Sequence, residues 1–179
     1  MALLSIQVCN QISKSEQQTS YMYWNSEKKL SWDDFKGTAP KGKSDCIAAF
    51  MGLSPLINIK NDSLVKVKVF ATFNRDSSWV KPNCKSLLLL EDEQNLFDIN
   101  EIYARKTMSY LQIHSFQYVD MKKVMKQYNS EKDSLMALYV KDVQASVLNQ
   151  NKWENRIDSM LMSIKKQSWD SVYIYQKRV

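Results

Sequence analysis

Between Ser86 and Leu111 the apolar residues recur at helical spacing along two sides of one stretch. One side holds Leu89, Leu96, Ile99, Tyr103 and Tyr110, and the other holds Leu90, Phe97, Ala104 and Met108. No proline or glycine interrupts the stretch, and Ser86 stands where a helix N-cap is expected. Because a helix that is apolar on two sides is covered by several partners, the pattern predicts a buried central helix over 86–111.

Before this helix the chain follows the two-residue period of β-strands. Val65, Val67, Val69, Ala71 and Phe73 alternate with more polar neighbours, which predicts a strand over 65–73 and a turn over 74–78. The apolar run 46–53 predicts a buried strand, which Ser54-Pro55 is expected to interrupt before a continuation over 56–59.

After the central helix the pattern predicts further helices over 119–128, 131–149 and 152–166, with a turn at Asn129-Ser130, and a closing strand over 172–175. Antiparallel strands followed by helices indicate an α+β fold. We expect one domain over 21–179, preceded by a polar, loosely ordered segment within 1–20.

Composition excludes several function classes. With 44% hydrophobic and 25% charged residues the chain has an ordinary globular composition, and no apolar run reaches the roughly 20 residues of a membrane-spanning helix. The net charge is +6, yet the predicted central helix is acidic and no element interleaves lysines with stacking aromatic rings. We therefore expect no nucleic-acid partner. The three glycines form no phosphate-binding loop.

The three cysteines are widely spaced and form no Cys-x-x-Cys motif, so a structural zinc site is not expected. They allow at most one disulfide. Cys46 and Cys84 each lie near a predicted strand end, which makes their pairing conceivable, although spacing does not establish it. Residues 1–9 are apolar but lack the basic region of a signal peptide.

Several motifs occur in an order that resembles domain-of-unknown-function family 922, over roughly residues 24–161. They are Trp24, Leu30-Ser31-Trp32-Asp33-Asp34-Phe35-Lys36-Gly37, Ala48-Ala49, Ser78-Trp79-Val80-Lys81, Glu93-Gln94-x-x-Phe97-Asp98-Ile99-x-Glu101-Ile102-x-Ala104-Arg105, Tyr139 and Gln150-x-x-Trp153-x-x-x-Ile157. That family consists of bacterial proteins, many from Bacteroidota, predicted to be periplasmic or secreted zinc-dependent proteases. The resemblance therefore implies a zincin-like central helix and a periplasmic or secreted location.

The family's central helix carries His-Glu-x-x-His, whose two histidines hold zinc while the glutamate activates the metal-bound water. The matching positions here are Asp92, Glu93 and Leu96, and the position of the third family histidine is Ala145. The only histidine, His114, lies beyond the predicted helix. The resemblance thus implies the scaffold while the sequence lacks the zinc ligands.

These observations predict a catalytically inactive metallopeptidase-like domain, with no metal or cofactor, that binds another protein. The predicted groove is the former cleft around Asp92, Glu93, Leu96 and Tyr103. Without a metal-bound water Glu93 has nothing to deprotonate, so we expect it to be structural or solvent-facing. Two alternatives stay open. One is an active hydrolase with a substituted metal site at Asp92 and Glu93, and the other is an immunity or inhibitor protein of a bacterial toxin system, by analogy alone.

Overall fold

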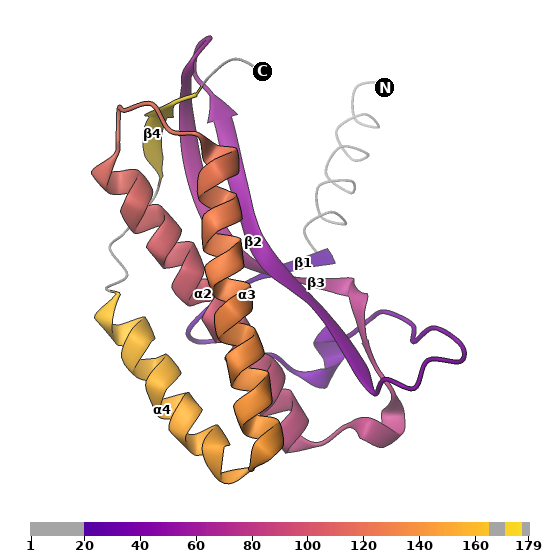
Figure 1. The fold of residues 1–179 in the computed structure, drawn as a ribbon. Coiled ribbons are helices and arrows are strands. Elements are labelled where there is room, and N and C mark those ends of the chain that lie inside the picture. The colour runs from indigo at the N-terminus through magenta and orange to yellow at the C-terminus, as the bar shows by residue number, and fades with distance from the viewer. Residues whose placement is uncertain (1–19, 165–170, 177–179) are drawn as a thin grey trace, which may run out of the picture.

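The computed structural model describes residues 20–164 and 171–176, and its elements follow the predicted order of strands and then helices (Figure 1). The strands are β1 (Tyr21–Tyr23), β2 (Ile47–Ile59), β3 (Leu64–Val80) and β4 (Val172–Tyr175). The helices are α2 (Leu87–Ile113), α3 (Met121–Ala145) and α4 (Leu148–Ser163), with short 3-10 turns η1 (Trp32–Asp34) and η2 (Pro82–Cys84). The α+β class is confirmed. The segment expected to be loosely ordered lies, apart from residue 20, outside the described residues.

A single antiparallel sheet is organised around β3. β2 pairs with β3 along most of its length, while β1 pairs with residues 72–74 and β4 with residues 64–67. Figure 1 shows the helices gathered on one side of this sheet. α2 contacts β3 as well as α3 and α4, so it lies between the sheet and the other two helices. The described helices include none that is both long and apolar enough to span a membrane.

α2 is the buried central helix that the apolar pattern predicts. The Ser86 side chain accepts a hydrogen bond from the backbone N of Leu89 at 3.2 Å, as expected of an N-cap. One side of α2 packs on the sheet, where Phe97 meets Phe73 of β3 with 6.1 Å between ring centres. The other side joins a second buried cluster with α3 and α4, formed by Ile99, Ile102, Tyr103, Tyr139, Trp153 and Ile157.

Two predicted strand breaks were wrong. β2 continues through Pro55, which stands opposite Val69. The Val69 N–H points away from β2, so this pair is one of the non-hydrogen-bonded pairs of the ladder and the missing N–H of proline costs nothing there. β3 continues past residue 74 because Ser78 supports a register shift in its pairing with β2: its hydroxyl donates to the Asn74 carbonyl at 2.6 Å and accepts from the Phe50 N–H at 2.9 Å.

The predicted turn at Asn129-Ser130 was also wrong, because α3 runs through it without a break. The Asn129 side chain donates to the Met125 carbonyl one turn earlier at 2.9 Å, and Ser134 donates to the Ser130 carbonyl at 2.9 Å. Polar residues that can form turns are thus satisfied inside a helix. α4 begins at Leu148, four residues before its predicted start, while the closing strand over 172–175 is confirmed.

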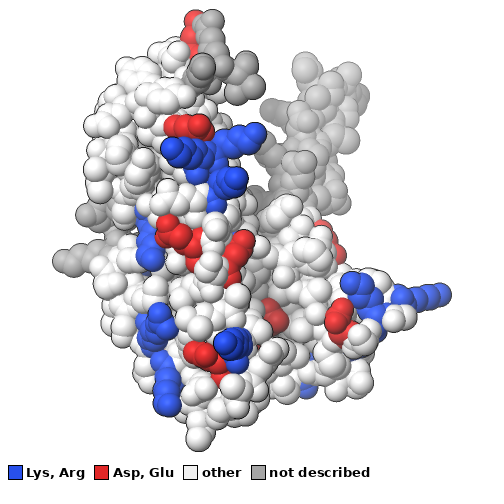
Figure 2. All heavy atoms as spheres, in the orientation of Figure 1, with Lys and Arg blue, Asp and Glu red and all other residues white. Residues whose placement is uncertain are grey.

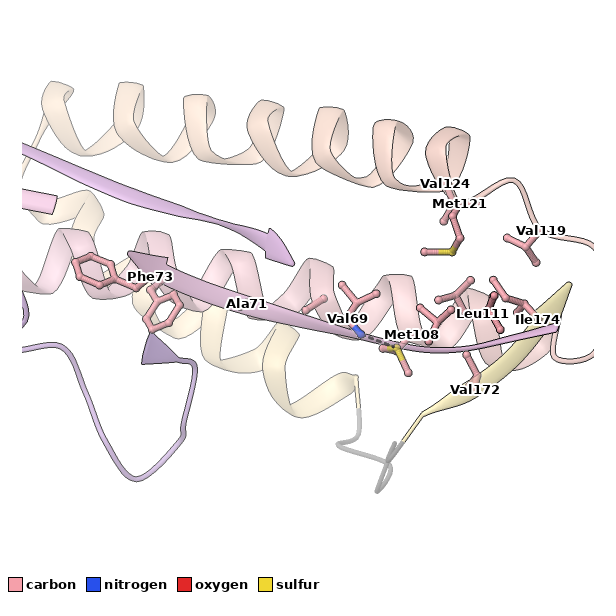
Figure 3. Packing of buried hydrophobic residues seen from close by; sticks show 14 of the residues in the cluster. Val69, Ala71, Phe73, Met108, Leu111, Val119, Met121, Val124, Val172 and Ile174 are labelled. Atoms are coloured by element: carbon pink, nitrogen blue, oxygen red, sulfur yellow. Dashed lines mark hydrogen bonds between the residues drawn. The ribbon is translucent and has the colours of Figure 1, made fainter. Parts of the chain in front are cut away.

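The sheet has a gap between β4 and β1, and a sulfur atom satisfies the backbone there. The Val69 N–H, which has no strand partner on that side, donates to the Met108 sulfur of α2 at 3.2 Å (Figure 3). Met108 is 4% exposed, so the contact is buried. The thioether replaces the carbonyl that a longer neighbouring strand would supply.

This contact predicts that Met108→Leu lowers the free energy of unfolding by about 1–2 kcal/mol, because the buried Val69 N–H loses its acceptor. The matched control is Met121→Leu, at an equally buried methionine whose sulfur accepts no hydrogen bond within the described chain. The control should cost less than about 1 kcal/mol, as volume-conserving core changes do. Denaturant titration of both variants measures the difference, and equal losses would contradict the role of the sulfur.

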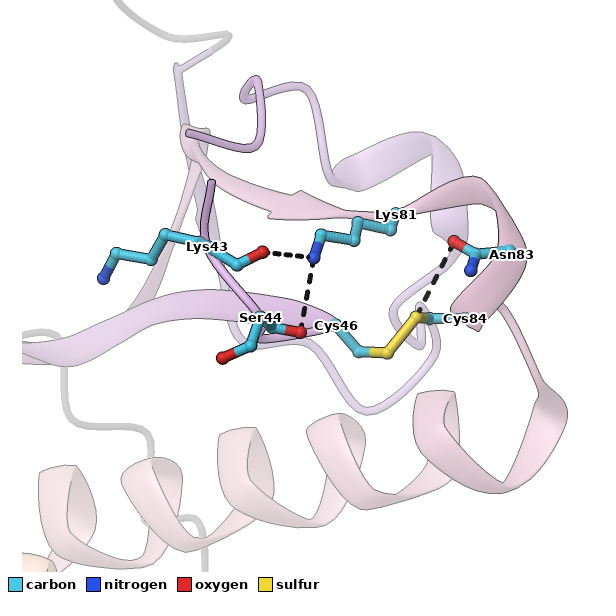
Figure 4. Close-up of a disulfide and its surroundings, with 6 residues drawn as sticks. All are labelled: Lys43, Ser44, Cys46, Lys81, Asn83 and Cys84. Carbon is cyan, nitrogen blue, oxygen red and sulfur yellow. Dashed lines mark hydrogen bonds between the residues drawn. A yellow bond between two sulfur atoms is a disulfide. The ribbon is translucent and has the colours of Figure 1, made fainter. Parts of the chain in front are cut away.

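The conceivable cysteine pair does form. A disulfide joins Cys46, just before β2, to Cys84 in η2, across a sequence separation of 38 residues (Figure 4). Lys81 reinforces the same junction, since its ammonium donates to the backbone carbonyls of Lys43 at 2.6 Å and Ser44 at 3.3 Å. The start of β2 is thus fixed to the segment that leads from β3 into α2.

Candidate functional site

The first of the degenerate ligand positions, Asp92, is occupied by an internal hydrogen bond. The hydroxyl of Tyr139, on α3, donates to Asp92 Oδ1 at 2.5 Å and accepts from the Asn95 amide at 3.2 Å. Tyr139 is fully buried. Burial raises the pKa of its hydroxyl, and the hydrogen bond to Asp92 raises that pKa further. The Asp92 carboxylate therefore holds α2 against α3.

Glu93, the retained glutamate, is only 7% exposed, so of the two expected roles, structural or solvent-facing, the solvent-facing one is excluded. No hydrogen bond or ion pair within the described residues compensates its carboxylate. Burial, followed by the charge of neighbouring Asp92, raises the pKa of Glu93 to about 7. The protonated form of this side chain is therefore substantially populated at neutral pH.

The remaining predicted positions do not assemble with Glu93 into a polar site. Leu96 is half-buried against the cluster shared by α2, α3 and α4, and Tyr103 is 6% exposed within that cluster. Ala145 is exposed at the last residue of α3. Within residues 20–164 and 171–176, no group of three or more histidine, cysteine, aspartate or glutamate side chains could hold a metal ion.

A cavity of about 440 Å³ lies on a neighbouring face of α2, between this helix, α4 and residues 29–30. We call it the α2–α4 cleft. Its lining combines acids with apolar residues and amides: Lys29, Leu30, Leu87, Leu90, Glu91, Gln94, Asn95, Asp98, Glu154 and Asp158. Four of these are acids and one is a lysine, so the cleft is negative although the whole chain carries +6. Figure 2 shows acidic and basic side chains intermingled over the face of the molecule on which α3 lies.

Asp98 fixes one wall of the α2–α4 cleft. Its carboxylate is 3% exposed and accepts hydrogen bonds from Trp24 Nε1 at 2.5 Å, Gln94 Nε2 at 2.7 Å and Lys29 Nζ at 3.2 Å. Gln94 in turn accepts from the Leu30 N–H at 2.7 Å. The segment before η1 is thereby attached to α2. Sequence analysis did not select Asp98 as a site residue, although Trp24, Gln94 and Asp98 all belong to the motifs quoted above.

The opposite wall, α4, is fixed by contacts to both neighbouring helices. Trp153 donates to Asp142 of α3 at 3.1 Å and packs edge-on against the Tyr139 ring, with 5.5 Å between ring centres. Arg105 of α2 donates to the Leu161 carbonyl at 2.9 Å. Since both walls are tied to α2 by partly buried hydrogen bonds, the cleft is largely preformed.

The Tyr139 hydroxyl predicts a measurable contribution to stability. Tyr139→Phe should lower the free energy of unfolding by about 2 kcal/mol, because a hydrogen bond to a carboxylate is lost and the buried Asn95 amide loses its acceptor. The control is Tyr128→Phe on the same helix, whose hydroxyl forms no hydrogen bond within the described part of the chain. Chemical denaturation should separate the two variants, and a loss below about 0.5 kcal/mol for Tyr139→Phe would contradict this assignment.

Comparisons of the chain with protein-family models, with curated proteins and with solved structures find no match. The resemblance to family 922 and the zincin-like assignment therefore remain predictions from the sequence motifs. The α2–α4 cleft and the Asp92–Tyr139 contact are described by the geometry alone.

Proposed function

We propose that this chain is a catalytically inactive metallopeptidase-like domain that binds a segment of another protein in the α2–α4 cleft. The observation that carries the proposal is the preformed cleft of about 440 Å³, which combines an acidic rim with an apolar lining. The groove predicted around Asp92 is less suited to this role, since Glu93 and Tyr103 are buried and Asp92 is engaged by Tyr139.

The inactive character is supported by the chemistry of the former ligand positions. Leu96 and Ala145 carry no atom with a lone pair for a metal, and Asp92 already accepts the Tyr139 hydroxyl. Glu93 lacks the neighbouring imidazoles that would hold a water for it to activate. Asp92 and Leu96 instead contribute to the contacts of α2 with its neighbouring helices, Ala145 is exposed, and Glu93 is buried.

The cleft favours an occupant of defined chemistry. Glu91, Glu154 and Asp158 are exposed at its rim, while Leu30 and Leu90 offer apolar contact. The Asp98 carboxylate is paired with Lys29 and also accepts from Trp24 and Gln94, so it adds little to the charge of the rim. A peptide segment with an apolar side chain flanked by lysine or arginine matches this arrangement, because the cations meet the rim and the apolar group meets the leucines.

A periplasmic or secreted location belongs to the same proposal. The Cys46–Cys84 disulfide supports it, because disulfides persist in oxidising compartments and are rare in the bacterial cytosol. The family resemblance points the same way.

A fluorescent eight-residue peptide with leucine between two lysines tests the cleft by anisotropy, with the corresponding leucine peptide flanked by glutamates as the reference ligand. Glu154→Gln combined with Asp158→Asn should weaken binding of the lysine peptide about tenfold, since two exposed ion pairs are lost. Asp33→Asn combined with Asp76→Asn removes the same charge from exposed sites outside the cleft lining and should leave binding unchanged.

Three results would overturn the proposal. These are equal affinity for both peptides, an equal loss in the control variant, or stoichiometric zinc binding with peptide cleavage that Glu93→Gln abolishes. The last result would establish the hydrolase alternative. Zinc titration by calorimetry and mass spectrometry of the peptide after incubation measure it directly.

A further inference from the structure

The face of the sheet that points away from the helices carries aromatic rings from all four strands. Directly paired residues share a face of a sheet and successive residues alternate between faces. Val67 and Phe73 face the helices, so Lys66, Lys68 and Phe70 of β3 lie on the opposite face. The register places further rings beside them. We call this surface the aromatic face, and its rings are Tyr21, Tyr23, Phe50, Phe70, Tyr173 and Tyr175.

Four of the six rings are exposed, while Phe70 and Tyr173 are half-buried. Tyr21 is 47% exposed, Tyr23 51%, Phe50 52% and Tyr175 41%. Soluble proteins seldom leave contiguous apolar area uncovered, and such patches commonly mark sites of interaction. The rings are also arranged in contact with one another, since Tyr23 and Phe70 lie 5.0 Å apart between ring centres.

Two cations are interleaved with the rings, an arrangement that the sequence analysis did not find because the four strands bring the rings together. Lys68 Nζ lies 5.1 Å from the centre of the Phe70 ring, and Lys66 Nζ lies 5.9 Å from that of Tyr173. No acidic residue occupies any of the paired positions on this face in the described strands. From Lys66 to Thr72 the face extends roughly 20 Å along β3, at about 3.3 Å per residue. The surface is therefore positive and aromatic over the length of several sugar or nucleotide units.

We propose that the aromatic face binds a linear acidic polysaccharide that bears carboxylates. A pyranose ring presents a face of C–H bonds, which pack favourably on the electron-rich face of an aromatic ring. Carboxylates on neighbouring sugars would meet Lys66 and Lys68, whose ammonium groups lie beside the rings. This site is separate from the α2–α4 cleft and does not depend on the function proposed for it.

A single-stranded nucleic acid, the alternative anionic polymer, presents the same combination of flat rings and repeated negative charge. The disulfide makes it the less favoured occupant, because disulfides are rare in cytosolic and nuclear proteins and nucleic acids are concentrated in those compartments.

The test measures binding of the full chain to sodium alginate, a polyuronate, by biolayer interferometry at low ionic strength. Neutral dextran, a thymidine 20-mer and phosphatidylglycerol vesicles are the competing probes. Lys66→Gln combined with Lys68→Gln should weaken alginate binding about tenfold. Tyr23→Thr combined with Tyr175→Thr, which preserves strand propensity, should weaken it to a similar degree. Lys126→Gln combined with Lys141→Gln, at exposed positions of α3, controls for net charge.

The proposal is supported if the chain binds alginate in preference to the other probes. Both face variants should weaken this binding, and the α3 variant should retain it. Absence of alginate binding, equal weakening by the α3 variant, or tighter binding of the thymidine 20-mer or the vesicles would overturn it. Circular dichroism of each variant confirms that the fold is retained, and a face variant that loses its fold is replaced by single substitutions at Lys68 and Tyr175, to which the same outcomes apply.

Discussion

Replacing both Cys46 and Cys84 by alanine is expected to lower the free energy of unfolding by about 4 kcal/mol. The crosslink closes a loop with a sequence separation of 38 residues, and the chain-entropy relation assigns about 4 kcal/mol to a loop of that size. Removing it gives the unfolded chain more conformations, while the β2–β3 ladder and the Lys81 hydrogen bonds remain to hold the same junction. The variant should therefore still fold, with a much lower midpoint of denaturation.

Guanidinium titration with and without reductant provides the measurement and its control. The wild-type chain should lose stability when reduced and should then match the double alanine variant. Reductant should have little effect on the double variant itself. If reduced and oxidised wild type unfold at the same denaturant concentration, the disulfide does not contribute as described.

The second large effect is a dependence of stability on pH that originates at Glu93. Its pKa is about 7 in the folded chain against 4.5 for a free carboxyl group. Below pH 4.5 the group is protonated in both states and imposes no penalty. Between about pH 4.5 and 7 the unfolded state is ionised while the folded state keeps its proton, so stability falls as pH rises, and it levels off above the folded pKa because both states are then ionised. The full difference corresponds to about 3 kcal/mol above pH 8.

Glu93→Gln should remove this dependence, because an amide does not ionise. The variant should exceed the wild type in unfolding free energy by about 2–3 kcal/mol at pH 8 and by little at pH 5. Glu91→Gln serves as the control, since Glu91 is exposed on the same helix two residues earlier. Denaturant titrations at pH 5, 6.5 and 8 give the comparison. The wild-type unfolding free energy is compared with that of the Glu91 control at each pH. If the two change equally over this range, the proposed effect of burying the Glu93 carboxyl is contradicted.

How much of the fold follows from sequence depends on whether the signal is local. The central helix has a cap, a continuous period and no helix breaker, all within 86–111, and α2 matches it. The turn predicted at Asn129-Ser130 failed because a helix can satisfy such side chains internally. The break predicted at Pro55 failed because the cost of a proline depends on which way its neighbours' N–H groups point, which only the pairing determines.

The candidate site was harder to predict because it is built from contacts between distant segments. Asp92 and Tyr139 are 47 residues apart, and Trp24 and Asp98 are 74 apart. No local sequence pattern indicates that a carboxylate accepts a hydrogen bond from a residue so far away in the chain. The aromatic face is similar, since each strand contributes only one or two of its rings and the sheet brings them together.

The position of the disulfide has a consequence for proteolysis. The turn that joins β2 to β3 contains Lys60 and lies in an exposed part of the hairpin, within the loop that Cys46 and Cys84 close. A trypsin-like enzyme that cuts after Lys60 leaves both fragments covalently joined and still paired along the ladder. The nicked molecule should migrate as one species in electrophoresis until a thiol reagent separates it into two.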